Sequence, residues 1–201
     1  QNVESSEKTV ATVTHALEIL NSYVKENKSI TSLLQVKKEI SEQVYESFGE
    51  KYESVTGIAK RIISLSKEIA EEKAELVRLQ TQAEILKPWV NLDIPINFKG
   101  TKYTAAFIGT LPRARTLEEI YAELAQYMPL DVEIISATKE QTCIFVLCLN
   151  TYKDKVFEKL RSMDFALPSV SNDRSPAEQL RELERQIEKV NERVNSLLEE
   201  I

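Results

Sequence analysis

Glycine, histidine and cysteine are scarce in this chain of 201 residues, and each shortage argues against a class of function. Its four glycines could hardly supply a phosphate-binding loop, and no GxGxxG or Walker-type motif occurs. His15 is the one histidine, without partners spaced to converge on a metal or to form a catalytic triad. We therefore expect His15 to be structural or solvent-facing.

Acidic pairs are present, but nothing accompanies them that would shape an active site. Glu71/Glu72 and Glu199/Glu200 are expected on exposed helix faces, where charge serves solubility. A pair of catalytic carboxylates needs a pocket, and no pocket-forming loop lies beside them. We predict no catalytic, cofactor-binding or metal-binding residues and no small-molecule substrate, and hence a protein that is not an enzyme.

Long apolar runs and an excess of basic residues are also missing. The longest apolar run, CIFVLCL at 143–149, is far shorter than the roughly 20 residues of a membrane helix. No charged-then-apolar signal region opens the chain, so we expect it to be soluble. A formal net charge of -6 without a Lys/Arg stripe argues against nucleic acid and anionic membrane as partners.

Two cysteines occur within one predicted strand. Cys143 and Cys148 are an odd number of residues apart, so their side chains would point to opposite faces of a sheet. They could not then form a disulfide with each other. We expect reduced core thiols in a cytoplasmic protein.

What the chain has in abundance is helical periodicity. Its composition, 42% hydrophobic, 29% charged and 7% aromatic, is typical of long helices. A first helix is predicted from about Ser5 to Glu26, with one apolar face formed by Val10, Val13, Leu17, Leu20 and Val24.

A second helix is expected to begin at Ser32, which has capping-box spacing to Gln35, and to run towards Phe48. Whether it breaks at Gly49 or continues is left open by the sequence.

A heptad seam follows between residues 55 and 86. Its apolar residues recur in steps of three and four, with one polar exception, Glu72. The seam comprises Val55, Ile58, Ile62, Leu65, Ile69, Glu72, Leu76, Leu79, Ala83 and Leu86. Pro88 should end this helix, because it disfavours the α conformation at Lys87.

A second seam closes the chain. Ser175 is predicted as an N-cap, with Pro176 in the first helical position and Glu178 completing a capping box. The apolar residues that follow are Leu180, Leu183, Ile187, Val190, Val194, Leu197 and Ile201.

The region between the seams predicts a small α/β lobe. Strands are expected at 103–110, 132–138 and 142–149, with a weak final strand at 165–170. One helix should begin at the capping box Thr116–Glu119 and run towards Met128, and another, capped by Asn150 or Thr151, should run through Arg161. This β-α-β-β-α-β order is that of a ferredoxin-like fold.

The predicted fold class is therefore α+β, an antiparallel coiled-coil stem that carries a ferredoxin-like lobe. The predicted domains are 1–90, a helical segment ending in the long stem helix, 98–170, the lobe, and 175–201, the returning helix. In that topology the first strand begins and the last strand finishes at the same end of the sheet, so the two seams should pair within one chain. Leu180 is expected near Leu86 or Ala83, and Val190 nearer Leu76 or Ile69.

Three side chains near the lobe are weaker candidates for a role. Arg113 and Arg115 precede a helix N-terminus and could bind an anion, although a solvated loop is favoured because the usual glycines are missing. Trp89 could anchor an interface, although covering the junction between helix and lobe is favoured.

Several stretches together resemble the cytosolic half of subunit I of bacterial and archaeal V/A-type rotary ATPases, the counterpart of the eukaryotic V-ATPase a subunit. They are the segments LKPWVNLDIPI, AAFIGTLP, DVEIISATKEQTCIFVLCL and LRSMDFALPSV, of which the PW.NLDIP junction and the RSMDF..P turn are the most telling. The likeness is clearest from Val55 onward.

This resemblance implies a non-catalytic stator element on the cytoplasmic side of the membrane. In the family, E/G-type peripheral-stalk heterodimers dock on the α/β lobes and hold the catalytic head still while the rotor turns. The chain departs from the pattern by having one lobe and no membrane segment, so we expect an excised piece that reaches the membrane only through an absent carboxy-terminal half. The family's membrane arginine has no position here.

Two other interpretations stay open. One is an unrelated coiled-coil scaffold that dimerises through the two seams. The other is a small-molecule sensor, because ferredoxin-like lobes often bind metabolites.

Overall fold

The computed structural model describes residues 2–23, 48–170 and 173–201. They fall into two compact units, Gln1–Leu76 with Val190–Ile201, and Val77–Lys189. Two long helices, α3 (Phe48–Leu86) and α6 (Pro176–Glu200), contribute to both units. The helix predicted from Ser32 towards Phe48 lies outside the described residues, as does the predicted end of the first helix at Glu26. The domain boundaries at 98–170 and 175–201 stay a prediction.

In the first unit, the last turns of α6 pack against α3. Leu197 joins Leu65 and Ile69 in one apolar cluster, in which the two α3 side chains are 1% exposed. Arg193 contacts Glu72. Glu200, about two turns further along α6, contacts Arg61, which lies earlier in α3. Later residues of α6 therefore meet earlier residues of α3, so the two predicted seams pair antiparallel within a single chain.

The prediction for the amino-terminal end of the seam is wrong. Val55 and Ile58 were expected to be buried, but Ile58 is 58% exposed and Val55 is also exposed. The reason is that α6 ends at Glu200, which contacts Arg61, so the helix has no residue opposite these two positions. The helix itself is regular here, and α3 runs through Gly49 and Gly57 without a break.

A different face of α3 packs against α1 (Asn2–Tyr23). Ala16 and Ala59 are buried together with Ile62, and the hydroxyl groups of Thr9 and Tyr52 form a 2.5 Å hydrogen bond. Val13 and Leu20 border this cluster as predicted, but Val10 and Leu17 are exposed. The two alanines explain why Val10 and Leu17 are exposed. Their small side chains let α1 and α3 approach closely at Ala16, so the face of α1 centred on Ala16 is buried instead of the predicted one.

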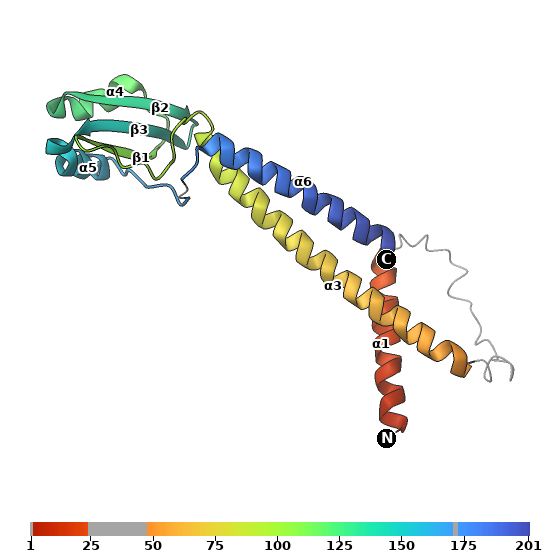
Figure 1. Cartoon of the computed structure of the whole chain (residues 1–201). Helices are drawn as coiled ribbons and strands as arrows, with labels where there is room; N and C mark the ends of the chain where they lie inside the picture. Colours follow the sequence, from red (N-terminus) through yellow and green to blue (C-terminus); the bar gives the residue numbers. More distant parts are fainter. Residues whose placement is uncertain (1, 24–47, 171–172) are drawn as a thin grey trace. The chain divides into compact units, whose positions relative to one another are not determined.

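In the second unit, three antiparallel strands form the sheet of the lobe (Figure 1). They are β1 (Thr104–Pro112), β2 (Leu130–Ala137) and β3 (Gln141–Leu149), in the order β1-β3-β2. Two helices accompany them, α4 (Leu117–Leu124) and α5 (Lys153–Ser162). The α+β class is thereby confirmed, and the first three predicted strands are confirmed to within two residues at each end.

Short 3-10 turns replace parts of the predicted helices. α4 ends at Leu124 and continues as η3 (Ala125–Tyr127), short of Met128. α5 is preceded by η4 (Asn150–Tyr152), and its N-cap Tyr152 makes no side-chain capping bond, so the predicted cap at Asn150 or Thr151 is wrong. The chain leaves α3 through η2 (Lys87–Trp89), with Pro88 at the predicted position.

The predicted fourth strand at 165–170 is reduced to one bridge. Ala166 exchanges two main-chain hydrogen bonds with Thr110 on the outer edge of β1, of 2.8 and 2.9 Å. Pro168 follows two residues later, and proline has no N–H with which to continue the ladder. The bridge still places this segment beside β1, where the last strand of a ferredoxin-like sheet belongs.

The two faces of the sheet bury different partners. One face carries Val146 and Cys148 and packs against α4 and α5 through Ile120, Val156 and Leu160. The other carries Cys143 and packs against the end of α3 and the segment after it, through Leu86, Trp89, Leu92 and Ile96. Both cysteines are free and buried, which confirms that they lie on opposite faces.

α6 begins as predicted. Ser175 Oγ accepts a hydrogen bond from the Glu178 N–H, and the Glu178 carboxylate accepts one from the Ser175 N–H. Leu183 then packs against the cluster that contains Leu86. The antiparallel register predicted from the seams is therefore correct to within about one helical turn.

Candidate docking surface of the lobe

The predicted chemical candidates lie in structural settings. The side chain of His15 is exposed on α1, with its Nδ1 3.7 Å from the Glu18 carboxylate. Glu71 is exposed and pairs with Lys67, whereas Glu72 is half-buried against Arg193 rather than on an exposed face. In the described parts of the chain, no three His, Cys, Asp or Glu side chains gather as metal ligands would.

The loop before α4 satisfies main-chain groups of Arg113, Arg115 and Thr116, whereas the Nε of Arg115 is buried without a hydrogen-bond partner in the described part of the chain. Thr116 and Glu119 form a complete capping box, so the carboxylate of Glu119 already occupies the helix N-terminus where an anion would bind. Thr142, the one buried polar core residue described, accepts from the Arg115 N–H at 2.9 Å and donates to the Arg113 carbonyl at 2.9 Å. These bonds support a structural role, and not anion binding, for the loop that contains Arg113 and Arg115.

Trp89 is 3% exposed and belongs to the cluster that joins the end of α3 to the sheet. The junction role favoured from sequence is confirmed, and a role as an exposed interface anchor is wrong.

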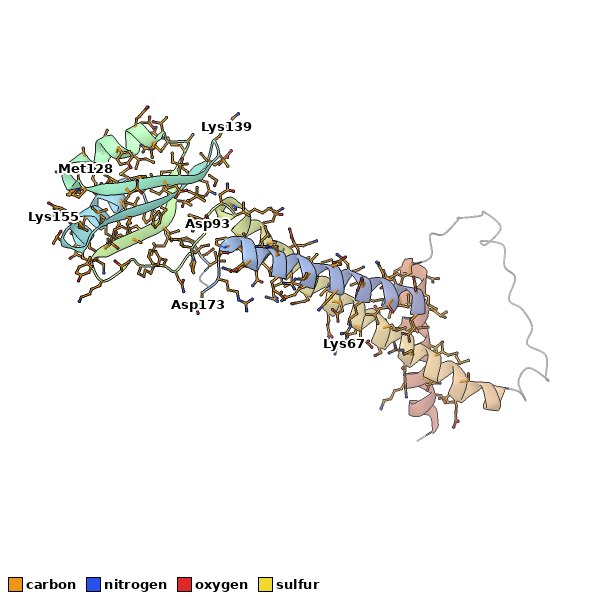
Figure 2. The ribbon with its side chains drawn as sticks, turned by 45° about the horizontal axis from the view of Figure 1, so that its top comes forward. Lys67, Asp93, Met128, Lys139, Lys155 and Asp173 are labelled. Carbon is orange, nitrogen blue, oxygen red and sulfur yellow. The ribbon has the colours of Figure 1, made fainter. Side chains whose placement is uncertain are left out.

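An exposed apolar patch lies across one end of the sheet. Tyr103 precedes β1, Leu149 ends β3 and Met128 lies just before β2, and these side chains are 71%, 40% and 52% exposed. The register brings these three positions to the same end of the sheet, since Thr104 pairs with Leu149 and Leu130 pairs with Cys148. Figure 2 shows Met128 and Lys155 at this end of the lobe, with Lys139 at the other. We call Tyr103, Met128 and Leu149 the tip patch.

The tip patch has the composition of a protein-binding surface. Tyrosine and methionine are enriched in the cores of interfaces, where charged residues are depleted. Tyr127 and Tyr152 pack against each other behind it at 6.4 Å between ring centroids, and Lys102 lies 5.5 Å from the centre of the Tyr103 ring. Rigid aromatic side chains of this kind lose little conformational entropy when a partner covers them.

Charge is distributed unevenly between the lobe and the rest of the chain. Residues 98–170 hold nine Lys/Arg and nine Asp/Glu, so the whole net charge of -6 lies outside the lobe. A net charge of zero gives the lobe no overall attraction to partners of either sign, whereas the net negative charge of the helical segments would repel an acidic partner.

Sequence patterns alone did not identify the tip patch. Its three residues come from three separate segments and are brought together only by strand register. Each of them, taken alone, is an ordinary residue near the end of a strand, so no local sequence motif indicates the tip patch.

Comparison with known proteins relates this chain to a solved structure by its fold and finds no match by sequence. No protein-family profile matches the chain, and no curated protein matches it in sequence. Among solved structures, it is similar to the crystal structure of the cytoplasmic N-terminal domain of subunit I, homolog of subunit a, of V-ATPase. The TM-score is 0.52 at 14% identity, covering 100% of this chain and 64% of that chain.

At that identity the likeness establishes the fold alone. It agrees with the α+β class derived from the sequence, and with the family that the PW.NLDIP and RSMDF..P segments resemble. The chain spans about 64% of the length of the neighbouring structure. None of the described helices is both long enough and apolar enough to cross a membrane.

Proposed function

We propose that the chain is a non-catalytic stator element of a V/A-type rotary ATPase or ATP synthase, the cytosolic domain that links the proton- or sodium-translocating membrane sector to the peripheral stalks. The observation that carries this proposal is the fold likeness to the cytoplasmic domain of subunit I, which extends over the whole chain. The segments LKPWVNLDIPI and LRSMDFALPSV, which resemble the same family, led to the same expectation.

The helices have physical properties that suit a stator. A helix of 39 residues, the length of α3, spans about 58 Å at 1.5 Å per residue. α6 packs against it through Leu197, Leu65 and Ile69, and two packed helices resist bending better than one. An element of this kind can hold a distant part of a machine against torque.

We further propose that the partner is an E/G-type peripheral-stalk heterodimer and that it docks on the lobe at the tip patch. α3 and α6 direct apolar residues at each other, which leaves mainly charged side chains facing outward. The tip patch offers apolar and aromatic side chains, and a standard interface needs only about 800 Å² from each partner.

The interaction of this chain alone should be weak. A peripheral stalk is held at two points, so each contact can be modest while the assembled machine remains stable. We expect a dissociation constant of about 1 μM or weaker.

Titration of purified E/G-type stalk heterodimer against the chain tests the proposal. The double variant Tyr103→Glu/Met128→Glu should weaken binding by at least about ten-fold, because it places two charges in the core of the interface. Val77→Glu is the matched control, since Val77 is an equally exposed apolar residue on α3, and its binding should match the wild type.

Two outcomes would contradict it. If the wild-type chain does not bind the stalk at high micromolar concentration, the stator assignment loses its support. If Val77→Glu weakens binding and the tip variant does not, the stalk docks on the helices instead.

A further inference from the structure

The end of the lobe that carries the tip patch is also its positive end. The charged residues at this end are exposed, and they are four lysines and two aspartates: Lys99, Lys102, Lys153, Lys155, Asp131 and Asp154. Because the lobe as a whole is neutral, the net charge of +2 here is balanced by a surplus of acidic residues elsewhere in the lobe.

Hydrogen bonds hold the turn before β1 against the turn after β3. The Asn150 N–H donates to the Tyr103 carbonyl at 3.0 Å, and the Asn150 side-chain amide donates to the Lys102 carbonyl at 2.8 Å. The Nζ of Lys102 lies 5.5 Å from the centre of the Tyr103 ring. One of the lysines therefore borders the tip patch directly.

The other three lysines lie close by. Lys99 and Lys153 line the same cavity of about 230 Å³, and Lys153 follows Leu149 by only four residues. Figure 2 shows Lys155 at the same end of the lobe as Met128. The apolar tip patch is thus bordered by basic side chains.

The charges of these lysines are available to a partner. Within the described residues none of the four lies in an ion pair, whereas Lys159, further along α5, is already paired with Glu123 at 2.6 Å. Basic groups around an apolar patch attract a partner of opposite charge and orient it as it docks.

The tip patch has the dimensions of one helix face. Its residues follow the strand order β1-β3-β2, so Tyr103, Leu149 and Met128 lie in that order across the end of the sheet. Neighbouring strands are about 4.8 Å apart, which makes the patch about 10 Å wide. Apolar side chains at i, i+4 and i+7 of a helix extend over about 10.5 Å at 1.5 Å per residue.

We propose that the tip patch binds an acidic amphipathic helix of the partner. Apolar side chains of one helix face lie on Tyr103, Leu149 and Met128, and carboxylates on both sides of that face meet the lysines. The inference rests on the proposed function in taking the tip patch as the docking surface, and it adds the chemistry that the stalk presents there.

The same observations favour a protein helix over an anionic membrane surface. Asp131 and Asp154 lie among the lysines, and a continuous negative surface would repel them, whereas a helix can place its carboxylates opposite the lysines alone. The formal net charge of the chain, -6, also opposes adsorption to anionic lipid.

The first test needs no stalk protein. The full 201-residue chain, labelled for amide NMR, is titrated with a capped helical peptide of about fifteen residues that carries three leucines on one face and glutamates on both sides of it. The amides of Tyr103, Met128 and Leu149 should shift most. The same peptide with lysine in place of glutamate should bind at least about ten-fold more weakly.

Charge reversal at the tip tests the role of the lysines. Lys102→Glu/Lys155→Glu should weaken binding of the acidic peptide by at least about ten-fold and make the lysine peptide the better ligand. Lys73→Glu/Lys139→Glu is the matched control, with the same change of charge on two exposed lysines away from the tip patch, and it should change binding less than about two-fold.

The stalk heterodimer provides the second test, in which Lys102→Glu/Lys155→Glu should again weaken binding by at least about ten-fold. If the stalk binds this variant as tightly as the wild type, the inference is overturned and the proposed function stands. If the acidic peptide binds as expected and the stalk does not bind at high micromolar concentration, the proposed function fails and the site for an acidic helix stands.

Three further results would overturn the inference. One is equal binding of the acidic and the lysine peptide, and another is the absence of any shift at Tyr103 and Met128 at millimolar peptide. The third is sedimentation of the wild-type chain, but not of Lys102→Glu/Lys155→Glu, with vesicles of equal parts phosphatidylserine and phosphatidylcholine, because the tip patch would then be a membrane contact.

Discussion

Arg193 on α6 reaches Glu72 on α3, with its Nε 2.8 Å from a carboxylate oxygen. Glu72 is the one polar residue in the heptad seam of α3, and its side chain is 20% exposed, while that of Arg193 is 66% exposed. The arginine therefore remains largely in water while it neutralises a half-buried carboxylate. A polar position in a seam is tolerated because the opposite helix supplies its partner.

Removing the arginine of this pair should lower stability more than replacing the glutamate by an apolar residue. Arg193→Ala should lower the free energy of unfolding by about 1 kcal/mol, because it leaves the Glu72 carboxylate half-buried without its cation. Glu72→Leu should leave stability unchanged or raise it, because leucine restores the apolar seam. Urea unfolding measures both.

The exposed pair Lys67–Glu71 is the control for this comparison. Both side chains are more than half exposed, so Lys67→Ala should change stability by less than about 0.5 kcal/mol. A loss equal to that of Arg193→Ala would mean that the contact with Glu72 is an ordinary surface ion pair.

Two isoleucines of the same predicted seam should respond very differently to truncation. Ile69→Ala should destabilise by about 2–5 kcal/mol, because Ile69 is 1% exposed in the cluster with Leu197. Ile58→Ala should cost less than about 1 kcal/mol, since Ile58 is 58% exposed. Thermal or urea unfolding distinguishes them, and equal losses would show that α3 is covered at Ile58 in solution.

The heptad pattern identified helix α3, but not how much of its apolar face is covered by α6. Heptad spacing is a local property of α3, whereas the burial of Ile58 depends on where α6 ends, at Glu200 opposite Arg61. The same limit applies to Val10 and Leu17, whose exposure follows from the alanine contact between α1 and α3. Capping boxes at Thr116 and Ser175 were predictable because each lies within four residues.

The tip patch was not predictable for a related reason. It depends on strand register, which brings residues from three separate segments to one end of the sheet. The reduction of the fourth predicted strand to one bridge was also missed, although Pro168 lies where the pairing stops.

Two glycines provide a matched test of packing. A Cβ atom on Gly109 would collide with the carbonyl oxygen of Ala166 and the ring of Phe165, so that the segment bridged to β1 would have to move. Gly109→Ala should therefore destabilise by about 1–3 kcal/mol. Gly57 lies within α3 with nothing within 4 Å of an added Cβ, and Gly57→Ala should stabilise by about 0.5–1 kcal/mol.

The contrast between these variants is the measurement. Chemical denaturation of both proteins under the same conditions should move the midpoints in opposite directions. If Gly109→Ala is as stable as the wild type, the 165–166 segment does not lie against β1 in solution.

The buried thiols predict a pH dependence of stability whose sign follows from their environment. Burial raises the pKa of both Cys143 and Cys148 above the ordinary value of a thiol. Well below about pH 8.5 the thiols are protonated in the folded and the unfolded chain alike, so they contribute no pH dependence there. Above it the unfolded chain loses these protons first, so the free energy of unfolding falls as pH rises towards the raised pKa of the folded state. Cys143→Ala/Cys148→Ala should be less stable than the wild type, and its decline between about pH 8 and pH 10 should be shallower, so that the difference in stability narrows as pH rises. Urea unfolding of both proteins at a series of pH values measures the slopes, and parallel slopes would mean that the thiols ionise as readily in the folded chain as in the unfolded one.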